Sequence, residues 1–327
     1  MTTYMQIVEE RISGLAKGVD ETVDSWFLMS SPAPVVGVVL VYLAFVLKIG
    51  PEYMKNRKPM DLKRIMVFYN AFQVCYSIWM CRTSIRESNV MASIFSKKCE
   101  ITRTREQTLA LYSGAWFYFF SKIIDLLDTT FFVLRKKDNQ ISFLHVYHHT
   151  VTALFSWAYL KYVPGEQGVI IGILNSGVHI IMYFYYMVAA MGPQYQKYLW
   201  WKKYMTSIQL IQFVLILGYM LAVGAKGCNM PKTLTFFFVG NTVIFLYLFG
   251  NFYRKTYKKA KTVDGAGSAT GSSLAKSALR AAGGMGCMPQ TMNVGNGKSA
   301  AFSLQNSLPG KAYIDLNNNS VKPLKLE

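Results

Sequence analysis

Long apolar stretches alternate with short polar connections along most of this chain. A helix that crosses a membrane needs about 20 mostly apolar residues. Stretches close to that length recur seven times in the sequence: 34–50, 65–81, 109–134, 141–160, 168–190, 206–225 and 234–253. The pattern predicts an all-α membrane protein with seven transmembrane helices.

The segments outside these stretches differ in composition. Residues 1–33 carry several acidic side chains before any long apolar run and lack the basic start of a cleaved signal peptide. From residue 262 onward, Gly, Ser, Ala and Asn dominate, and no periodic apolar face remains. We therefore predict a lumenal N-terminal segment over 1–33, a membrane domain over 34–261 and a disordered cytosolic tail over 262–327.

The composition of the whole chain agrees with a membrane protein. Its 327 residues are 52% hydrophobic and only 16% charged, which is atypical of soluble proteins. A formal net charge of +18 would indicate nucleic acid in a soluble chain, but here the basic residues fall mainly between apolar stretches. Basic residues in such positions set membrane topology, contact lipid headgroups or hold an anionic substrate. We therefore expect membrane lipid as a partner and no nucleic acid.

The distribution of Lys and Arg predicts an orientation, because these residues favour the cytoplasmic side of a membrane. The connections that follow the odd-numbered stretches hold 16 basic residues. The N-terminal segment and the connections after the even-numbered stretches hold 11. This bias places the N-terminus in the lumen or outside the cell and the C-terminus in the cytosol.

All four histidines of the chain lie in two adjacent stretches. The spacing of His145, His148 and His149 places all three on one face of a helix, and His179 lies in the next stretch. A buried polar side chain costs free energy unless it has a partner, and ionisable groups within a membrane usually face a bundle interior or a cavity. The pattern indicates a reaction site, and the alternative is a set of core histidines satisfied by their neighbours.

Other polar residues interrupt the neighbouring stretches. Lys122, Asp125 and Asp128 follow one another at three-residue steps, and each charge costs about 2.5–3.5 kcal/mol at the bilayer centre. We expect them to pair with one another or with the histidines; the alternative is a charged helix end near the headgroups. Further polar residues in the fifth and sixth stretches are candidate supporting residues: Asn175, Tyr183, Gln209 and Gln212. For the two glutamines, lining a site and hydrogen-bonding between helices are equally open.

The same residues limit the cofactors that the chain can use. Four histidines are too few for the di-iron site of membrane desaturases and hydroxylases, which takes its ligands from several histidine boxes. A single zinc held by three histidines stays open as an alternative. The sequence has no glycine-rich phosphate loop and no dinucleotide fingerprint. We therefore expect no metal and no cofactor.

Four motifs in succession resemble those of a known family. HVYHH at 145–149 resembles an HxxHH box, and KIIDLLDT at 122–129 resembles KxxExxDT, with Asp125 in place of the usual Glu. NSGVHIIMYFYY at 175–186 resembles NxxxHxxMYxYY, and TSIQLIQF at 206–213 resembles TxxQxxQF. With NRKPMDLKRIMVFYN at 56–70, these motifs make the chain similar to the very-long-chain fatty acid elongases.

The resemblance implies a fold, a reaction and a location. It implies seven membrane helices that enclose an acyl-chain tunnel, and a 3-oxoacyl-CoA synthase that joins a long-chain acyl-CoA to malonyl-CoA with release of CoA and CO₂. It implies the endoplasmic reticulum membrane, with the ketoacyl reductase, dehydratase and enoyl reductase of the elongation cycle as partners, and it leaves a homo-oligomer open. A seven-helix transporter or receptor for a lipid ligand is the competing interpretation. The clustering of the histidines in two stretches disfavours a transporter built from matching halves.

An imidazole can act as a nucleophile and form an acyl-imidazole. We hypothesise that His148 accepts the acyl group, with His145 and His149 as alternatives on the same face. His179 and Asn175 would orient the thioester or hold the developing oxyanion. In the competing route both substrates bind together, and the histidines act only as base and donors.

The remaining candidate residues are expected to support the histidines or to bind CoA. Lys122, Asp125 and Asp128 would fix the imidazole tautomer, as the third group of a catalytic triad does. CoA carries several phosphates, so its entrance should be basic and cytosolic. The candidate CoA-binding residues are Arg135, Lys136, Lys137, Tyr186, Lys202, Lys203, Thr206, Arg254 and Lys255.

Cys99 and Cys228 both fall in connections predicted to be lumenal. Because the lumen is oxidising, we predict a disulfide between them, against the alternative of two free thiols. Reduction should then change the electrophoretic mobility of the wild-type protein but not that of Cys99→Ser. A mobility shift that persists in Cys99→Ser would contradict the pairing.

Overall fold

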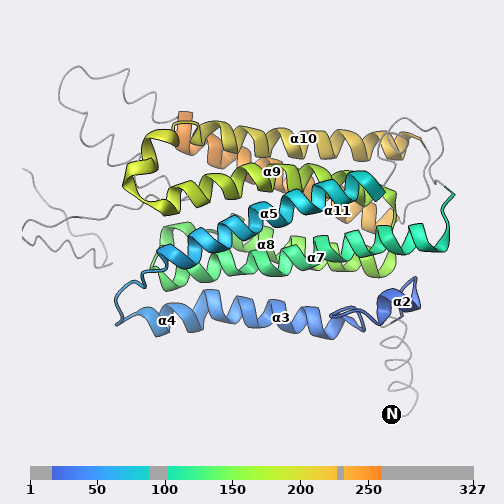
Figure 1. Cartoon of the computed structure of the whole chain (residues 1–327), viewed down its shortest axis with the longest axis horizontal. Helices are drawn as coiled ribbons and strands as arrows, with labels where there is room; N and C mark the ends of the chain where they lie inside the picture. The colour runs from blue at the N-terminus through green and yellow to red at the C-terminus, as the bar shows by residue number, and fades with distance from the viewer. Residues whose placement is uncertain (1–16, 88–101, 227–231, 259–327) are drawn as a thin grey trace, which may run out of the picture. The chain divides into compact units, whose positions relative to one another are not determined.

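The computed structural model describes residues 17–87, 102–226 and 232–258 (Figure 1). All of them belong to the first of two compact units, Met1–Thr291, and the second unit, Met292–Glu327, lies outside the described residues. The predicted Cys99–Cys228 disulfide and the predicted tail over 262–327 also lie outside them. The structure therefore leaves both predictions untested.

Helices form the regular structure of the described residues, none of which lies in a β-strand. Each predicted apolar stretch coincides, within a few residues, with a long helical segment, the first of which joins α3 to α4 through a π-helical turn over Phe45–Ile49. The helices are α2 (Glu21–Asp24), α3 (Pro32–Ala44), α4 (Gly50–Met54), α5 (Lys63–Glu87), α7 (Arg105–Leu134), α8 (Phe143–Tyr162), α9 (Glu166–Met191), α10 (Lys202–Ala225) and α11 (Lys232–Tyr253).

Four helical segments of the described residues are long and apolar enough to cross a membrane: Pro32–Met54, Gln167–Met191, Lys202–Ala225 and Thr235–Thr256. They confirm the prediction of an all-α membrane protein. The helices α7 and α8 are less apolar because they carry the charged residues and three of the histidines. The count of seven transmembrane helices stays a prediction.

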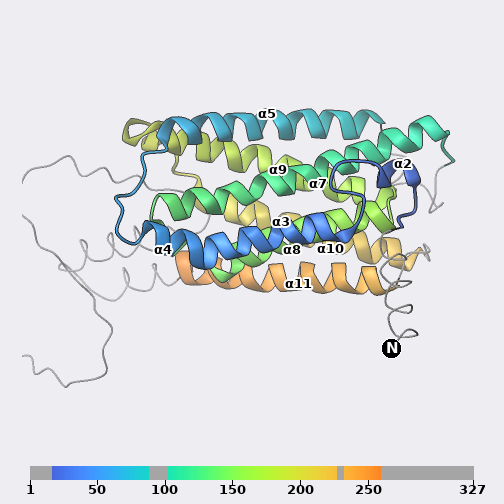
Figure 2. The ribbon, with the colours of Figure 1, turned by 90° about the horizontal axis from the view of Figure 1, so that it is seen from below.

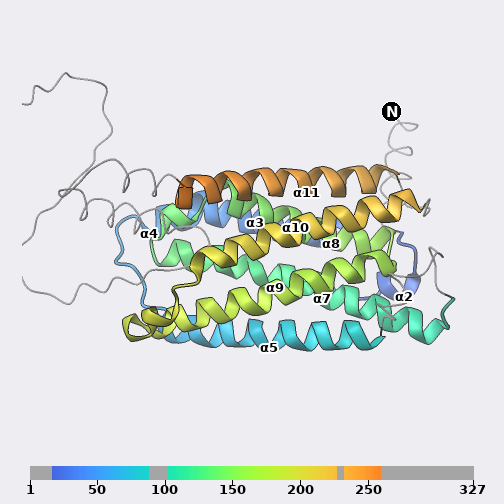
Figure 3. The ribbon, with the colours of Figure 1, turned by 90° about the horizontal axis from the view of Figure 1, so that it is seen from above.

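The long helices run side by side, and successive helices point in opposite directions (Figure 1). The most extensive packing joins α5 to α9 and α7 to α8. Views from below and above place α5 and α11 on opposite sides of the bundle, with α7, α8, α9 and α10 between them (Figure 2, Figure 3). The helices that carry the histidines and the charged residues of the third stretch, α7, α8 and α9, therefore lie between α5 and α11 (Figure 2, Figure 3).

Helix caps set where the two central helices begin. Ser142 accepts a hydrogen bond from the backbone N–H of His145 at 3.2 Å, which satisfies a free donor of the first turn of α8. At the start of α7, Thr104 and Gln107 form a reciprocal capping box. These caps satisfy backbone donors at the first turns of α7 and α8.

The segment that precedes α3 packs against α7 and α8 at the end of the bundle that also holds α2. Val23 and Met29 share a buried core cluster with Phe119 of α7 and with Trp157 and Leu160 of α8. This apolar contact fixes the N-terminal part of the described chain on the bundle.

A buried lysine strengthens the same contact. The side chain of Lys161 is fully buried, and its Nζ lies 2.7 Å from Asp24 Oδ1, 2.7 Å from the carbonyl of Met29 and 3.3 Å from that of Ser30. An ammonium group has three hydrogens, so each of them has an acceptor here. Lys161 thus ties the end of α8 to the segment before α3.

Asp20 and Arg105 form a second, surface ion pair near the start of α7. Arg105 also donates to the hydroxyl of Thr22 at 2.9 Å. The hydrogen bond from Arg105 is the main reason why the pKa of the Asp20 carboxyl is lowered to about 2. Because the Arg105 side chain is 59% exposed, this pair contributes little to stability.

Replacement of Lys161 by Met is expected to destabilise the protein because it removes the cation beside Asp24 and the donor to Asp24 Oδ1 and to two backbone carbonyls. Loss of one partner of a buried ion pair costs about 3–5 kcal/mol, and the partial exposure of Asp24 favours the lower end of that range. The apparent Tm in detergent should fall. Lys48→Met, at an exposed position, is the matched control, and an equal Tm for the two variants would contradict this role of Lys161.

Candidate active site

The structure brings all four histidines together around one cavity of about 100 Å³ inside the bundle, which we call the histidine cavity. The ring centres of His145 and His149 lie 4.3 Å apart, and those of His148 and His149 lie 5.6 Å apart. His179 reaches the same cavity from α9. The spacing on α8 and the packing of α9 thus place four imidazoles in one small volume.

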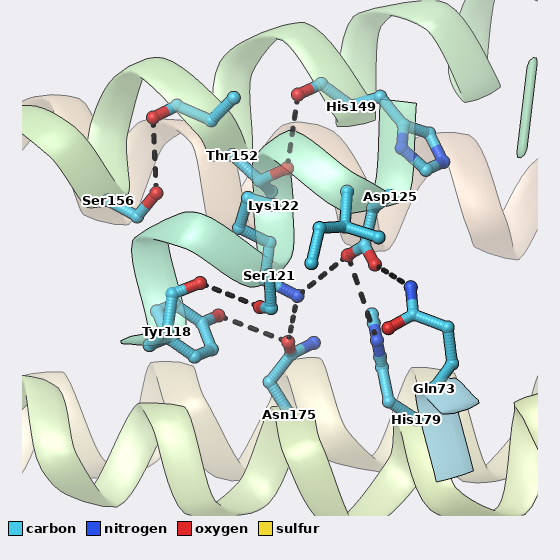
Figure 4. Close-up of polar contacts among 12 residues, drawn as sticks. Gln73, Tyr118, Ser121, Lys122, Asp125, His149, Thr152, Ser156, Asn175 and His179 are labelled. Atoms are coloured by element: carbon cyan, nitrogen blue, oxygen red, sulfur yellow. Dashed lines mark hydrogen bonds and ion pairs between the residues drawn. The ribbon is translucent and has the colours of Figure 1, made fainter. Parts of the chain in front are cut away.

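Beside this cavity, Lys122 and Asp125 form a buried ion pair (Figure 4). Lys122 Nζ lies 3.1 Å from Asp125 Oδ2 and donates to Asn175 Oδ1 at 2.8 Å. The hydroxyl of Tyr118 donates to the same amide oxygen at 3.1 Å. Because lysine can only donate, it fixes the Asn175 amide with its oxygen toward Lys122, and the NH₂ group remains free to donate elsewhere.

Asp125 is the centre of this polar cluster. Gln73 donates to its Oδ1 at 2.7 Å, and the hydroxyl of Tyr183 lies 3.0 Å from the same oxygen. His179 Nδ1 lies 3.8 Å from Oδ2, which is too long for a hydrogen bond but within ion-pair distance. Side chains from α5, α7 and α9 thus converge on one carboxylate (Figure 4).

Asp128, one turn further along α7, lines the histidine cavity. Its Oδ2 lies 2.8 Å from the hydroxyl of Tyr183, so this single hydroxyl stands between Asp128 and Asp125. Tyr183 is fully buried, and the ring of Tyr69 packs edge-on against it with ring centres 6.1 Å apart. The two carboxylates are therefore connected through a rigidly held phenol.

A second cavity, of about 160 Å³, extends from the histidines toward the end of the bundle that holds α2; we call it the apolar cavity because most of its lining is apolar. On α8 the lining runs from His148 through Thr152 and Phe155 to Tyr159. Residues spaced three or four apart along a helix share a face. The distance from His148 to Tyr159 along the helix is about 17 Å at 1.5 Å per residue.

The two cavities share four lining residues: His148, Asn175, Gln212 and Phe213. His148 is the only one of the four histidines that lines both cavities. Its ring centre lies 5.0 Å from that of Phe245, and neither of its ring nitrogens is hydrogen-bonded to another described residue. A nitrogen of His148 is thus open to a ligand at the junction of the cavities.

The two glutamines of α10 also lie in the lining. Gln209 lines the histidine cavity and contacts the sulfur of Met182 on α9, with Nε2 and Sδ 3.5 Å apart. Gln212 lines both cavities. Both glutamines therefore line a cavity, and Gln209 also contacts a neighbouring helix; their role in a reaction site stays a prediction.

The basic candidates for CoA binding gather at the end of the bundle drawn on the left in Figure 1, the end opposite α2. Arg135, Lys136 and Lys137 follow the end of α7. Lys202 and Lys203 begin α10, and Arg254 and Lys255 follow the end of α11. Arg135 is buried, and this burial lowers the pKa of its guanidinium, against the opposing charge of Asp61. Lys136 donates to the carbonyl of Lys55 at 3.0 Å. Of the other two candidates, Tyr186 lines the histidine cavity and Thr206 is buried in α10.

Three residues of the polar cluster were not identified from the sequence: Tyr69, Gln73 and Tyr118. Gln73 donates to Asp125 and to the hydroxyl of Tyr69, at 3.1 Å, and Lys122 Nζ lies 4.8 Å from the ring centre of Tyr118. An amide inside an otherwise apolar stretch is a signal that could have identified Gln73. Tyr69 lies within the motif at 56–70 that supports the family resemblance, whereas nothing in the sequence distinguishes Tyr118 from the other tyrosines, of which the chain has 21 in all.

Among the described residues, no group of three or more His, Cys, Asp or Glu side chains is arranged to hold a metal ion. The zinc alternative therefore has no ligand set in residues 17–87, 102–226 and 232–258.

Comparison with known proteins decides the family. Residues 27–264 match the family model ELO, described as the GNS1/SUR4 family. The chain belongs to this family. This elongase is 41% identical over 249 residues to very long chain fatty acid elongase 7 of Rattus norvegicus. The aligned region covers 75% of this chain and 88% of the rat protein. It is 39% identical over 243 residues to very long chain fatty acid elongase 4 of Homo sapiens, with 74% and 77% covered.

The match confirms the resemblance found in the four motifs. Together with the apolar helices, it identifies the elongase as a multi-pass membrane enzyme of fatty acid elongation. The competing interpretation as a transporter or receptor is not favoured. The roles of individual residues stay predictions.

The elongase should depend on the Lys122–Asp125 pair for stability. Lys122→Met leaves a buried carboxylate without its cation, which costs about 3–5 kcal/mol. The double variant Lys122→Met/Asp125→Asn has no uncompensated buried charge at this pair. Its Tm should therefore be close to that of the wild type, while its activity stays low. Measurement of Tm for the wild type, both single variants and the double variant checks this, and additive losses would contradict the coupling.

Proposed function

We propose that this elongase condenses a long-chain acyl-CoA with malonyl-CoA, and that His148 carries the acyl group between the two steps. The position of His148, where the histidine cavity meets the apolar cavity, is the observation that supports this most directly. A thioester carbonyl at this junction would have its acyl chain in the apolar cavity and its CoA portion toward the basic end of the bundle.

In the first step, a ring nitrogen of His148 attacks the thioester carbonyl. The carbon–sulfur bond breaks, and the CoA sulfur takes the proton of the imidazole N–H, so the products are an acyl-imidazole and free CoA. The absence of a hydrogen bond from either ring nitrogen to another described residue supports this role, because the attacking nitrogen needs a free lone pair.

In the second step, malonyl-CoA loses CO₂, and the resulting enolate attacks the acyl carbon. The new carbon–carbon bond forms as the bond to His148 breaks. Negative charge develops on carbonyl oxygens, and donors held in place before the reaction stabilise it. The NH₂ group of Asn175 fits this role because Lys122 fixes its orientation and Asn175 lines both cavities.

The basic end of the bundle suits the phosphates of CoA, and we place it on the cytosolic side of the endoplasmic reticulum membrane, with the N-terminus in the lumen. We further propose seven transmembrane helices that enclose the acyl chain. The reaction transfers an acyl group without a redox step, so we propose that it needs no cofactor. Its 3-oxoacyl-CoA product would pass to the ketoacyl reductase, dehydratase and enoyl reductase of the elongation cycle.

Incubation of the purified protein with a long-chain acyl-CoA alone tests the covalent route. Wild type should release about one equivalent of CoA and gain the mass of one acyl group, because the first step needs no second substrate. His148→Ala should lose both signals while keeping its Tm. If the wild type turns over normally with acyl-CoA and malonyl-CoA but releases no CoA with acyl-CoA alone, the route in which both substrates bind together is favoured. No 3-oxoacyl-CoA with any acyl length would contradict the condensation itself.

A further inference from the structure

The proposed condensation consumes one proton per turnover, and the inference below rests on that reaction. In the second step, the acyl-imidazole and the malonyl-CoA carboxylate give 3-oxoacyl-CoA, CO₂ and an imidazole that has no proton. A proton must return to that nitrogen before the next cycle. The histidine cavity lies inside the bundle, so a donor within it would supply this proton more directly than bulk water.

The hydroxyl of Tyr183 indicates where a proton is held. It lies 3.0 Å from Asp125 Oδ1 and 2.8 Å from Asp128 Oδ2, both within hydrogen-bond distance. A phenol has one hydrogen and can donate to only one carboxylate at a time. The second contact is a hydrogen bond only if that carboxyl group carries a proton and donates to the oxygen of Tyr183.

The partners of the two carboxylates decide which of them carries the proton. Asp125 receives hydrogen bonds from Lys122 and Gln73, which stabilise its negative charge. Asp128 takes part in no ion pair among the described residues. Two carboxylates that share a site do not both ionise readily, and the one without a cation takes the proton. The arrangement is therefore a chain from the Asp128 O–H to the Tyr183 oxygen, and from the Tyr183 O–H to Asp125.

We propose that Asp128 is the proton donor of the condensation step. Its O–H bond breaks as the bond between the acyl group and His148 breaks, and the proton goes to the imidazole nitrogen that leaves. Asp128 then remains as a carboxylate until a proton from water restores it. Charge balances, because the carboxylate charge lost with CO₂ reappears on Asp128.

The surroundings of Asp128 allow this transfer. Asp128 and all four histidines line the histidine cavity, whose volume of about 100 Å³ has room for a water molecule that relays the proton. The charged and titratable groups that line this cavity or lie near Asp128 are Tyr42 of α3, Tyr69 of α5, Lys122 and Asp125 of α7, His145, His148 and His149 of α8, and His179, Tyr183 and Tyr186 of α9. Lys122 is the only lysine or arginine of this set, and it is already paired with Asp125.

Asp128→Asn tests the proposal because an amide keeps the size and a hydrogen bond to Tyr183 but cannot release a proton. With acyl-CoA alone, the variant should release CoA as the wild type does, since that step moves the proton of the imidazole itself. With malonyl-CoA added, turnover should fall about 100-fold, the lower end of general acid catalysis, and acylated protein should accumulate. Turnover of the variant should decline as the pH is raised through neutrality, because its protons then come from solvent.

The controls separate this role from a structural one. Asp138→Asn, an exposed carboxylate in the turn after α7, is the matched control and should behave as wild type. Asp128→Glu keeps an acid at the position and should restore much of the turnover, which keeps the proposal testable if Asp128→Asn does not fold. The proposal would be overturned if Asp128→Asn turned over as fast as the wild type. It would also be overturned if the variant lost CoA release from acyl-CoA alone to the same extent as turnover. If the wild type releases no CoA from acyl-CoA alone, that result counts against the acyl-histidine intermediate. The turnover and pH dependence of the Asp128 variants would still test the role of Asp128 as proton donor.

Discussion

The buried ion pair between Lys122 and Asp125 constrains most of the polar structure around it. Two charges inside an apolar bundle are tolerated only when each is paired and hydrogen-bonded. Lys122 therefore holds the amide of Asn175, and Asp125 accepts a hydrogen bond from Gln73 (Figure 4). The hydroxyl of Tyr183 also lies within hydrogen-bond distance of Asp125. These partners belong to α5 and α9 and the ion pair to α7, so a single electrostatic requirement fixes three helices relative to one another. It also orients the side chains that face the histidines.

The register of α8 turns this fixed framework into a site. Its histidines face the cluster at one end of the helix, and the same face continues for about three turns as an apolar wall that ends at Tyr159. The histidine cavity and the apolar cavity therefore meet at His148, the one histidine among their four shared lining residues. In the proposed reaction this position is where the polar thioester and the hydrocarbon chain of one substrate must also meet.

The sequence was sufficient to predict what depends on local pattern. Apolar length placed the helices, and three-residue and four-residue spacing placed His145, His148 and His149 on one face of α8. The motifs identified the family. Contacts between helices could not be predicted, because nothing in the local sequence of α5 indicates that Gln73 meets Asp125 or that Tyr69 packs against Tyr183. The position of His148 at two cavities depends on the packing of several helices, so spacing along α8 alone could not distinguish it from its neighbours.

A structure of the protein after incubation with a long-chain acyl-CoA would test the central claim most directly. We expect an acyl group bonded to a ring nitrogen of His148, with its chain extending through the apolar cavity toward Tyr159. An acyl group on another residue, or a chain that lies outside this cavity, would contradict it.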